Sequence, residues 1–169
     1  ESAERIGFEL VLAHAQHGLR PGDEEKECQL VTALAGQLGL ALHVQALTID
    51  SRLKKRVGIE ASSRAARLSW LEDLARELGA SSIFLGHHRD DQLETILLRR
   101  RAGLPPERAL GMRERRGIFV RPLLGRTRAD LLELAVQRNW HWVEDPSNGD
   151  LRFARNQLRH VDIPEAERQ

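Results

Sequence analysis

Residues 83–95 read Ile83-Phe84-Leu85-Gly86-His87-His88-Arg89-Asp90-Asp91-Gln92-Leu93-Glu94-Thr95. A short apolar run ends at Gly86, and ionisable side chains follow at once. Leu93, Ile96 and Leu97 then begin a helical pattern. In open α/β sheets, ligands bind just beyond the carboxyl ends of the strands. The stretch therefore predicts a strand followed by a helix, with the edge of an active site between them.

The composition indicates a globular chain without a membrane segment. Its 169 residues, 41% of them hydrophobic, suffice for one domain with a core of its own. The apolar runs are too short to cross a bilayer and no signal peptide is recognisable, so we expect no membrane association and a cytoplasmic location. Cys28 is the only cysteine, which excludes a disulfide or a multi-cysteine zinc site within the chain.

The formal net charge of +1 hides an uneven distribution of charge. Between Arg99 and Arg128 there are ten arginines and two acids, Glu107 and Glu114. A genome rich in arginine codons would explain the high ratio of arginine to lysine, but not this clustering. Like charges repel unless a polyanion or an acidic surface meets them, and arginine pairs bidentately with phosphate. Residues 99–128 are therefore interpreted as a basic loop region.

Apolar and amphipathic segments alternate along the first hundred residues. The sequence predicts strands over 8–13, 42–47 and 82–86. It predicts helices over 23–38, 59–78 and 91–101. Strands that alternate with helices form parallel sheets through right-handed crossovers. The expected fold class is α/β, a parallel sheet with helices on both faces.

The last third of the chain is expected to be mainly helical. After a short strand over 117–120, Thr127 can N-cap a helix that has Asp130 at its third position and reaches about Arg138. A short final helix should cover 153–159. The predicted organisation is one domain over 1–169, with the basic loop region at 99–128 and a C-terminal helical part at 127–169.

Asp91 and Glu94 are three residues apart, which places them on one helix face about 5–6 Å apart at Cβ. Two such carboxylates can hold Mg²⁺ on a polyphosphate, because Mg²⁺ completes its shell with water and phosphate oxygens. The same spacing resembles a capping box, and acids favour this end of the helix dipole, so spacing alone favours a cap. Three acids, with Asp90, beside two histidines exceed what capping needs, which shifts the interpretation toward a functional site.

His87 and His88 can bind metal, transfer protons or contact phosphate. A single histidine after a strand is more often a structural residue, but His14 and His17 lie at the end of another predicted strand. Together with the acids, the four would allow a metallohydrolase centre, although no helical His-Glu-x-x-His pair is present. The loop from His17 to Gly22 can present N–H groups to phosphate, or its glycines and proline can serve the turn alone.

Taken in order, these segments resemble the tRNA(Ile)-lysidine synthases, a family of PP-loop ATP pyrophosphatases. The matching segments are 14–20, 58–61 with Arg64 and Arg67-Leu68, 86–95, 101–103, 111–112, 121–124, 142–148 and 155–159. The resemblance runs from Leu12 to Pro164 and implies an adenine nucleotide alpha hydrolase-like fold. The family opens with a strand and a Ser-Gly-Gly-x-Asp-Ser loop, which residues 1–7 do not contain. We therefore expect a domain that lacks its first βα unit. Leu68-Ser69-Trp70 also departs from the family, which tends to have tyrosine after the arginine.

The resemblance implies a ligase that forms a carbon–nitrogen bond in two steps. ATP adenylates the wobble cytidine of tRNA(Ile) and releases pyrophosphate, and the amine of L-lysine then displaces AMP to leave lysidine. Asp91 and Glu94 would hold Mg²⁺ on the ATP phosphates or orient the amine. His87 and His88 would lie by the reacting centre.

The resemblance also assigns roles to residues outside this stretch. Arg67, Arg155 and Arg159 would face phosphates or the activated intermediate. The expected ATP contacts are His14, His17, Gly18, Arg20 and Gly86. The expected tRNA contacts are Arg113, Arg115, Arg116 and Arg121. A homodimer is left open, as are two alternatives: a non-catalytic tRNA-binding fragment, and another PP-loop tRNA-modifying enzyme such as a thiolase, which typically needs cysteine pairs.

Overall fold

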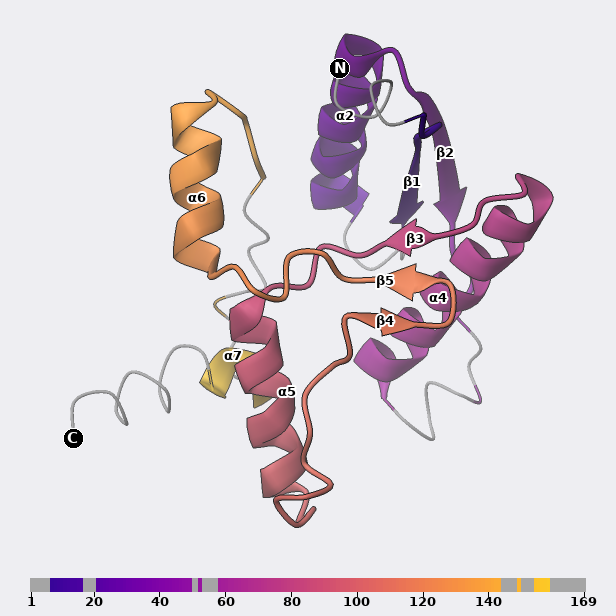
Figure 1. The fold of residues 1–169 in the computed structure, drawn as a ribbon. Coiled ribbons are helices and arrows are strands. Elements are labelled where there is room, and N and C mark those ends of the chain that lie inside the picture. The colour runs from indigo at the N-terminus through magenta and orange to yellow at the C-terminus, as the bar shows by residue number, and fades with distance from the viewer. Residues whose placement is uncertain are drawn as a thin grey trace. The chain divides into compact units, whose positions relative to one another are not determined.

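The computed structural model describes residues 7–16, 21–49, 52, 58–143, 149 and 154–158. The chain divides into two compact units, Glu1–Ala80 and Ser81–Gln169, and each is described by itself (Figure 1). Both units combine strands with helices, so the predicted α/β fold class is confirmed. Among the described residues, no helix is long and apolar enough to cross a membrane. One domain over the whole chain stays a prediction.

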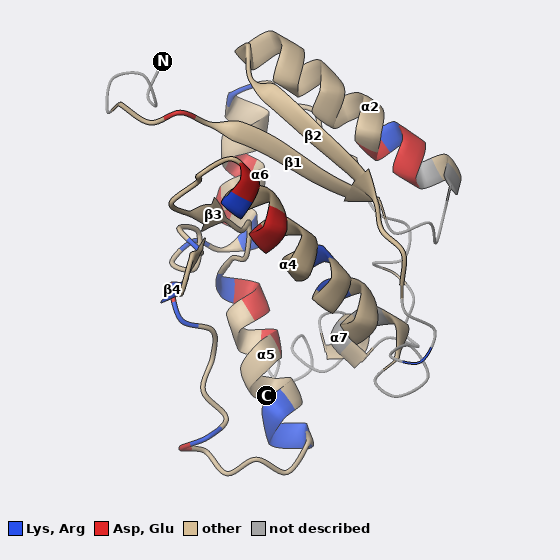
Figure 2. Cartoon of the chain, turned by 90° about the vertical axis from the view of Figure 1, so that its right-hand side faces the viewer, with Lys and Arg blue, Asp and Glu red and all other residues tan. Residues whose placement is uncertain are grey.

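The first unit begins with a strand–helix–strand arrangement. β1 (Val11–Gln16) pairs in parallel with β2 (Ala41–Ala46) along its whole length. α2 (Pro21–Leu38) connects the two strands and lies along the pair (Figure 2), and α4 (Ile59–Glu77) follows. The predicted parallel pairing is confirmed. β1 begins later than the predicted strand and continues to Gln16, where the Leu47 N–H extends the pairing by donating to the Gln16 carbonyl at 2.7 Å.

The second unit contains a small mixed sheet. β3 (Ile83–Phe84) pairs in parallel with β5 (Phe119–Val120), and β4 (Arg115–Arg116) pairs with β5 in antiparallel fashion. β5 was predicted and β4 was not, because two consecutive arginines show no apolar alternation. β4 forms because Gly117, with φ of 60°, takes the left-handed conformation that a tight hairpin turn requires.

The described residues of the second unit also form the helices α5 (Arg89–Arg101), α6 (Arg128–Gln137) and α7 (Ala154–Gln157). α5 begins two residues before the predicted Asp91, because His88 is its N-cap. α6 begins after Thr127, as predicted, and has Asp130 as its third residue. The final helix predicted over 153–159 is confirmed as far as the structure describes it.

Four of these helices end in the same way. A residue with positive φ follows each of α2, α4, α5 and α6: Gly39 directly after α2, and Gly79, Gly103 and Asn139 two positions beyond the last residue of the other three. The next N–H then bonds to the carbonyl five residues earlier, as Leu40 does to Ala35 at 3.0 Å. Glycine tolerates this left-handed conformation without steric cost, which is why a glycine after an amphipathic run predicted the ends of α2 and α4 well.

Each unit has its own buried residues. In the first unit they include Ala35 on α2 with Leu71 and Ala75 on α4, and the last two were predicted to face inward. Leu78 was predicted to do so as well, but it is 46% exposed because it lies beyond the last turn of α4. In the second unit the buried apolar residues are Ala109, Phe119, Leu124 and Leu158. Among the described polar residues of this unit, Glu94, Arg121 and Asn156 are buried as well.

Candidate functional site at the start of α5

The site lies where β3 gives way to α5. The Leu85 N–H donates to the Val120 carbonyl at 2.9 Å, so the strand pairing continues to the residue before Gly86. A Cβ on Gly86 would meet no atom within 4 Å, which leaves its backbone open to a ligand. His87 and His88 are partly buried, and α5 begins directly after them. The order predicted for this stretch, a strand and then a helix, is confirmed.

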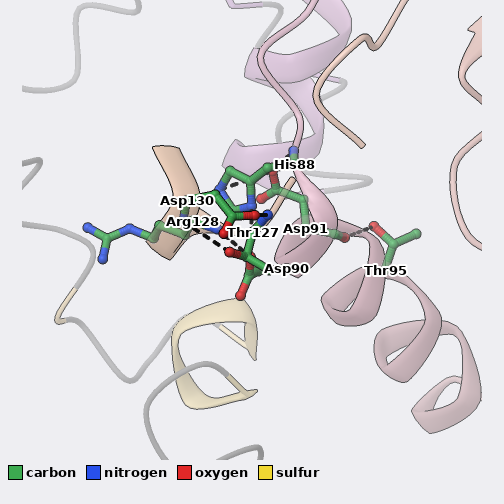
Figure 3. A network of polar contacts seen from close by, with 7 residues as sticks. All are labelled: His88, Asp90, Asp91, Thr95, Thr127, Arg128 and Asp130. Carbon is green, nitrogen blue, oxygen red and sulfur yellow. Dashed lines mark hydrogen bonds and ion pairs between the residues drawn. The ribbon is translucent and has the colours of Figure 1, made fainter. Parts of the chain in front are cut away.

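Asp91 closes the first turn of α5. The His88 N–H donates to Asp91 Oδ2 at 2.9 Å, and the Asp91 carbonyl accepts from Thr95 Oγ1 at 2.7 Å (Figure 3). Asp91 is thus the N3 member of a capping box that starts at His88, rather than the first member of one that ends at Glu94. Asp91 therefore does cap the helix, but the capping box spans His88 to Asp91, three residues earlier than the box from Asp91 to Glu94 that the sequence suggested.

The imidazole of His88 lies between two carboxylates. Its Nδ1 is 3.3 Å from Asp90 Oδ2, and its Nε2 is 3.5 Å from Asp91 Oδ2 (Figure 3). These contacts are ion pairs only when the imidazole is protonated. The His88 and Asp91 side chains are 15% and 17% exposed, so water reaches this arrangement only in part.

Asp90 ties the start of α5 to the start of α6. Its Oδ2 accepts from the Arg128 N–H at 2.8 Å, and the Arg89 N–H donates to the Arg126 carbonyl at 2.8 Å. Two helix N-termini therefore meet here, and each needs acceptors for its free N–H groups. Asp91 thus serves the start of α5 and Asp90 the start of α6, whereas Glu94 belongs to neither capping box, and a function for these acids beyond capping stays a prediction.

α6 carries a capping box of its own. The Thr127 N–H donates to Asp130 Oδ2 at 2.9 Å, and the Asp130 N–H donates to Thr127 Oγ1 at 3.1 Å. The backbone and hydroxyl of Thr127 lower the pKa of the Asp130 carboxyl, and the nearby charges of Arg126 and Arg89 act in the same direction. Thr127 and Asp130 thus have the roles that the sequence predicted.

Glu94 differs from the other two acids. It lies one turn further along α5 and is only 1% exposed. A carboxylate so enclosed is costly to keep charged unless cations or donors compensate it. Glu94 and Asp91 share one helix face and offer hard oxygen ligands of the kind Mg²⁺ takes, so the donor set fits this ion. A Mg²⁺ held here would draw its remaining ligands from water and phosphate.

No group of three or more His, Cys, Asp and Glu side chains among the described residues is arranged to hold a metal ion. The metallohydrolase hypothesis required such a group from His14, His17, His87, His88 and the acids. The described part of the chain gives it no support, and His17 lies outside that part.

The four arginines predicted to contact tRNA separate into two environments. Arg113, Arg115 and Arg116 are exposed on and before β4. Arg121 is 7% exposed, and its Nη1 donates to the Arg113 carbonyl at 3.1 Å. Burial, and next the charge of Arg116, lower the pKa of Arg121. Arg121 therefore supports the backbone beneath the exposed arginines.

Other predicted site residues lie in the first unit or beyond the described residues. In the first unit, His14 stands opposite Val44 in the β1–β2 pair, and its buried Nε2 has no hydrogen-bond partner among the described residues. Arg67 is partly buried on α4. Arg155 is described only as part of α7, without its side chain. His17, Gly18, Arg20 and Arg159 lie outside the described residues.

Sequence reasoning missed the role of Gln92. Its side-chain Nε2 donates to the Met112 carbonyl at 2.7 Å, and its Oε1 accepts from the Met112 N–H. No local signal could have found this contact, because the two residues are twenty positions apart. The bond from Asp90 to Arg128 was missed for the same reason.

The comparisons with known proteins agree with this architecture. Residues 1–166 match the PP-loop domain family. The chain belongs to this family. The PP-loop chain is 40% identical over 163 residues to the tRNA(Ile)-lysidine synthase of Thermus thermophilus, covering 95% of this chain and 31% of that protein. It is 40% identical over 156 residues to the tRNA(Ile)-lysidine synthase of Methylobacterium nodulans, covering 90% and 45%.

The chain thus spans about a third to just under half of the length of these relatives. Among solved structures, this PP-loop chain resembles the U34-tRNA thiolase NcsA from Methanococcus maripaludis with its [4Fe-4S] cluster. The TM-score is 0.68 at 14% identity, and the match covers 98% of this chain and 61% of that one. This likeness shows a shared fold.

Proposed function

We propose that this PP-loop domain is the catalytic domain of a cytoplasmic tRNA(Ile)-lysidine synthase. ATP adenylates the wobble cytidine of tRNA(Ile), pyrophosphate leaves, and the amine of L-lysine displaces AMP. The observation that carries the proposal is the pair Asp91 and Glu94 on one face of α5, directly beyond the carboxyl end of β3. Ligands of open α/β folds bind at this place. The likeness to lysidine synthases over nine-tenths or more of the chain supports the choice of reaction.

Asp91 and Glu94 would act on the phosphates and the amine. Mg²⁺ held by the two carboxylates would neutralise charge on the ATP phosphates. Asp91 is partly exposed and is the acid that incoming lysine can reach, whereas Glu94 is enclosed and would act from beneath. Lysine attacks as a free amine, so its ammonium group must first lose a proton, and a carboxylate beside it can accept that proton.

His87 and His88 would serve the same step from the loop before α5. His88 lies beside both acids, with Nδ1 3.3 Å from Asp90 Oδ2 and Nε2 3.5 Å from Asp91 Oδ2. Gly86, with open space where a side chain would stand, would let the ATP approach the backbone closely. In the first unit, His14 and Arg67 keep their proposed contacts to ATP and its phosphates. The same holds for His17, Gly18, Arg20, Arg155 and Arg159.

The exposed arginines of the basic loop region would bind tRNA(Ile). Arg113, Arg115 and Arg116 present their charge to solvent, and affinity for a nucleic-acid backbone is mainly electrostatic. Acidic and basic side chains are unevenly distributed along α5 (Figure 2). Its first turn contains acids, and its last turn contains Arg99, Arg100 and Arg101. The basic end of α5 is where the basic loop region begins, and the exposed arginines proposed to bind tRNA lie further along that region.

The test is transfer of labelled lysine to tRNA(Ile) by the full-length protein. Transfer should require ATP and tRNA(Ile) together, and pyrophosphate should be released only when the tRNA is present. An enzyme that consumes ATP with tRNA but ignores lysine would be another PP-loop tRNA-modifying enzyme. Binding of tRNA without any ATP turnover would make the domain a non-catalytic RNA-binding module.

A further inference from the structure

The segment 110–114 has no regular structure of its own, yet each of its five carbonyls accepts a hydrogen bond. Arg99 Nη1 donates to the carbonyls of Leu110 and Gly111, and Gln92 Nε2 donates to that of Met112. Arg121 supplies the last two, from Nη1 to Arg113 at 3.1 Å and from its backbone N–H to Glu114 at 2.8 Å. A loop whose backbone is satisfied by side chains from elsewhere is held in one place.

Two of these donors lie on α5, where they form one row. Gln92 and Arg99 are seven residues apart, which is about two helical turns, so both project from the same face. Gln92 uses both ends of its amide, because Oε1 also accepts from the Met112 N–H. The two bonds resemble the paired N–H and C=O bonds between neighbouring β-strands. The amide of a glutamine can form both because it offers a donor and an acceptor side by side.

Gly111 is the residue that lets Gln92 approach. A Cβ at this position would stand 2.6 Å from Cδ of Gln92, closer than real Cβ atoms come to a neighbour. The φ of Gly111 is not in the positive range, so alanine is compatible with the backbone here. Gly111→Ala would therefore displace the Gln92 amide without straining the main chain.

The geometry points to Gln92 as a positioning residue. Together with Arg99 and Gly111 it forms a clamp on the segment 110–114. The clamp fixes the arginines at 113, 115 and 116 at a set distance from the acids at the start of α5. We infer that this clamp sets where tRNA backbone meets the catalytic end of the helix. The inference rests on the proposed function in one respect, namely that these arginines contact tRNA. Gln92 itself touches neither substrate nor reacting atoms.

The experiment compares four variants of the full-length protein: Gln92→Met, Gly111→Ala, the double variant, and Gln137→Met as a matched control. Gln137 bonds only to Glu133, one turn away on α6, among the interactions the structure describes. Amide hydrogen exchange at Met112 should accelerate about tenfold or more in the first three and stay unchanged in the control. The half-saturating tRNA(Ile) concentration should rise about fivefold while kcat changes little.

The double variant decides between a clamp and general loosening. Both substitutions break the same contact, so the effect of the double variant should equal that of either single one. Additive effects, unchanged exchange at Met112, or a fall in kcat at constant tRNA affinity would each overturn the inference. If wild-type protein transfers no lysine, the proposed function fails, but exchange and tRNA affinity still test the clamp.

Discussion

Asp91 combines two demands on one carboxylate. It accepts the His88 N–H at the start of α5, and under the proposed function it would also hold Mg²⁺ or orient the amine. The two roles can be separated because an asparagine oxygen can still accept the N–H, although it carries no charge. The residue that sequence reasoning weighed between a cap and a metal ligand is thus a candidate for both.

Replacing Asp91 by asparagine should therefore abolish chemistry and spare the fold. We expect Asp91→Asn to lower lysine transfer by about 10²-fold or more, with thermal stability and tRNA affinity close to wild type. Asp91→Ala should lose activity too and, in addition, about 1 kcal/mol of stability through the missing cap. Lysine transfer assays and thermal melts measure the two effects. Wild-type activity in Asp91→Asn would show that the carboxylate is only a cap.

Local contacts at this scale could be predicted, and distant ones could not. The Thr127–Asp130 box follows from two residues three positions apart, so its pattern is visible in the sequence. The bond from Asp90 to the Arg128 N–H joins residues 38 positions apart, and it exists only because two helix starts meet. Arg121 was predicted to contact RNA for its charge, while its 7% exposure depends on the hairpin around it.

At the scale of elements, α6 depends on its capping box in a way that pH can reveal. Because the folded-state pKa of Asp130 is lowered, its contribution to stability is full above its unfolded pKa and is lost as pH falls through the folded value. Asp130→Asn should therefore be less stable than wild type above the unfolded pKa of an aspartate, about 3.9, and the difference should shrink as pH falls through the lowered folded-state pKa. Chemical denaturation across this range gives the comparison. A gap that persists at the acidic end would mean that charge is not the cause.

The β4–β5 hairpin is the element that should bind RNA. Arg115→Glu combined with Arg116→Glu should weaken tRNA binding and flatten its dependence on salt, because phosphate contacts release counterions. Filter binding at several salt concentrations measures both. Arg138→Glu, an exposed arginine just beyond α6, is the matched control and should change little. Equal weakening by the control would indicate a general charge effect instead of a defined face.

Helices were easier to predict than strands in this chain. The amphipathic runs of α2 and α4 and the glycines after them place both helices to within two residues at each end. β3, β4 and β5 contain two residues each, too few for alternation to register, and β4 consists of arginines. Its pairing is set by the turn at Gly117 and by β5, which is information the segment itself does not contain.

At the scale of the whole molecule, α7 and Leu158, at the end of the described chain, support α5, the helix that carries the candidate site. Leu158, directly after α7, is 1% exposed, and α7 packs against α5 (Figure 1). Leu158→Ala should lower the free energy of unfolding by about 2–4 kcal/mol, because it leaves a cavity that the surroundings fill only in part. Denaturant titration with Leu134→Ala, a partly exposed leucine on α6, as a control provides the measurement. A cost no greater than that of the control would place Leu158 outside the core.

Membership of the PP-loop family was within reach of sequence reasoning because many short motifs occur in the right order, although each alone is weak. No single motif among them predicts the chemistry of the reaction. The reaction proposed for this chain would use ATP, lysine and tRNA together, and the chain spans about a third to just under half of the length of the relatives it matches.

The most direct measurement is mass spectrometry of the wobble nucleoside of tRNA(Ile) after incubation with ATP, lysine and the full-length protein. We expect the cytidine to gain one lysine with loss of water, and the product to disappear in Asp91→Asn. An unmodified cytidine in the presence of folded wild-type protein that binds tRNA(Ile), or a product carrying sulfur, would contradict the account.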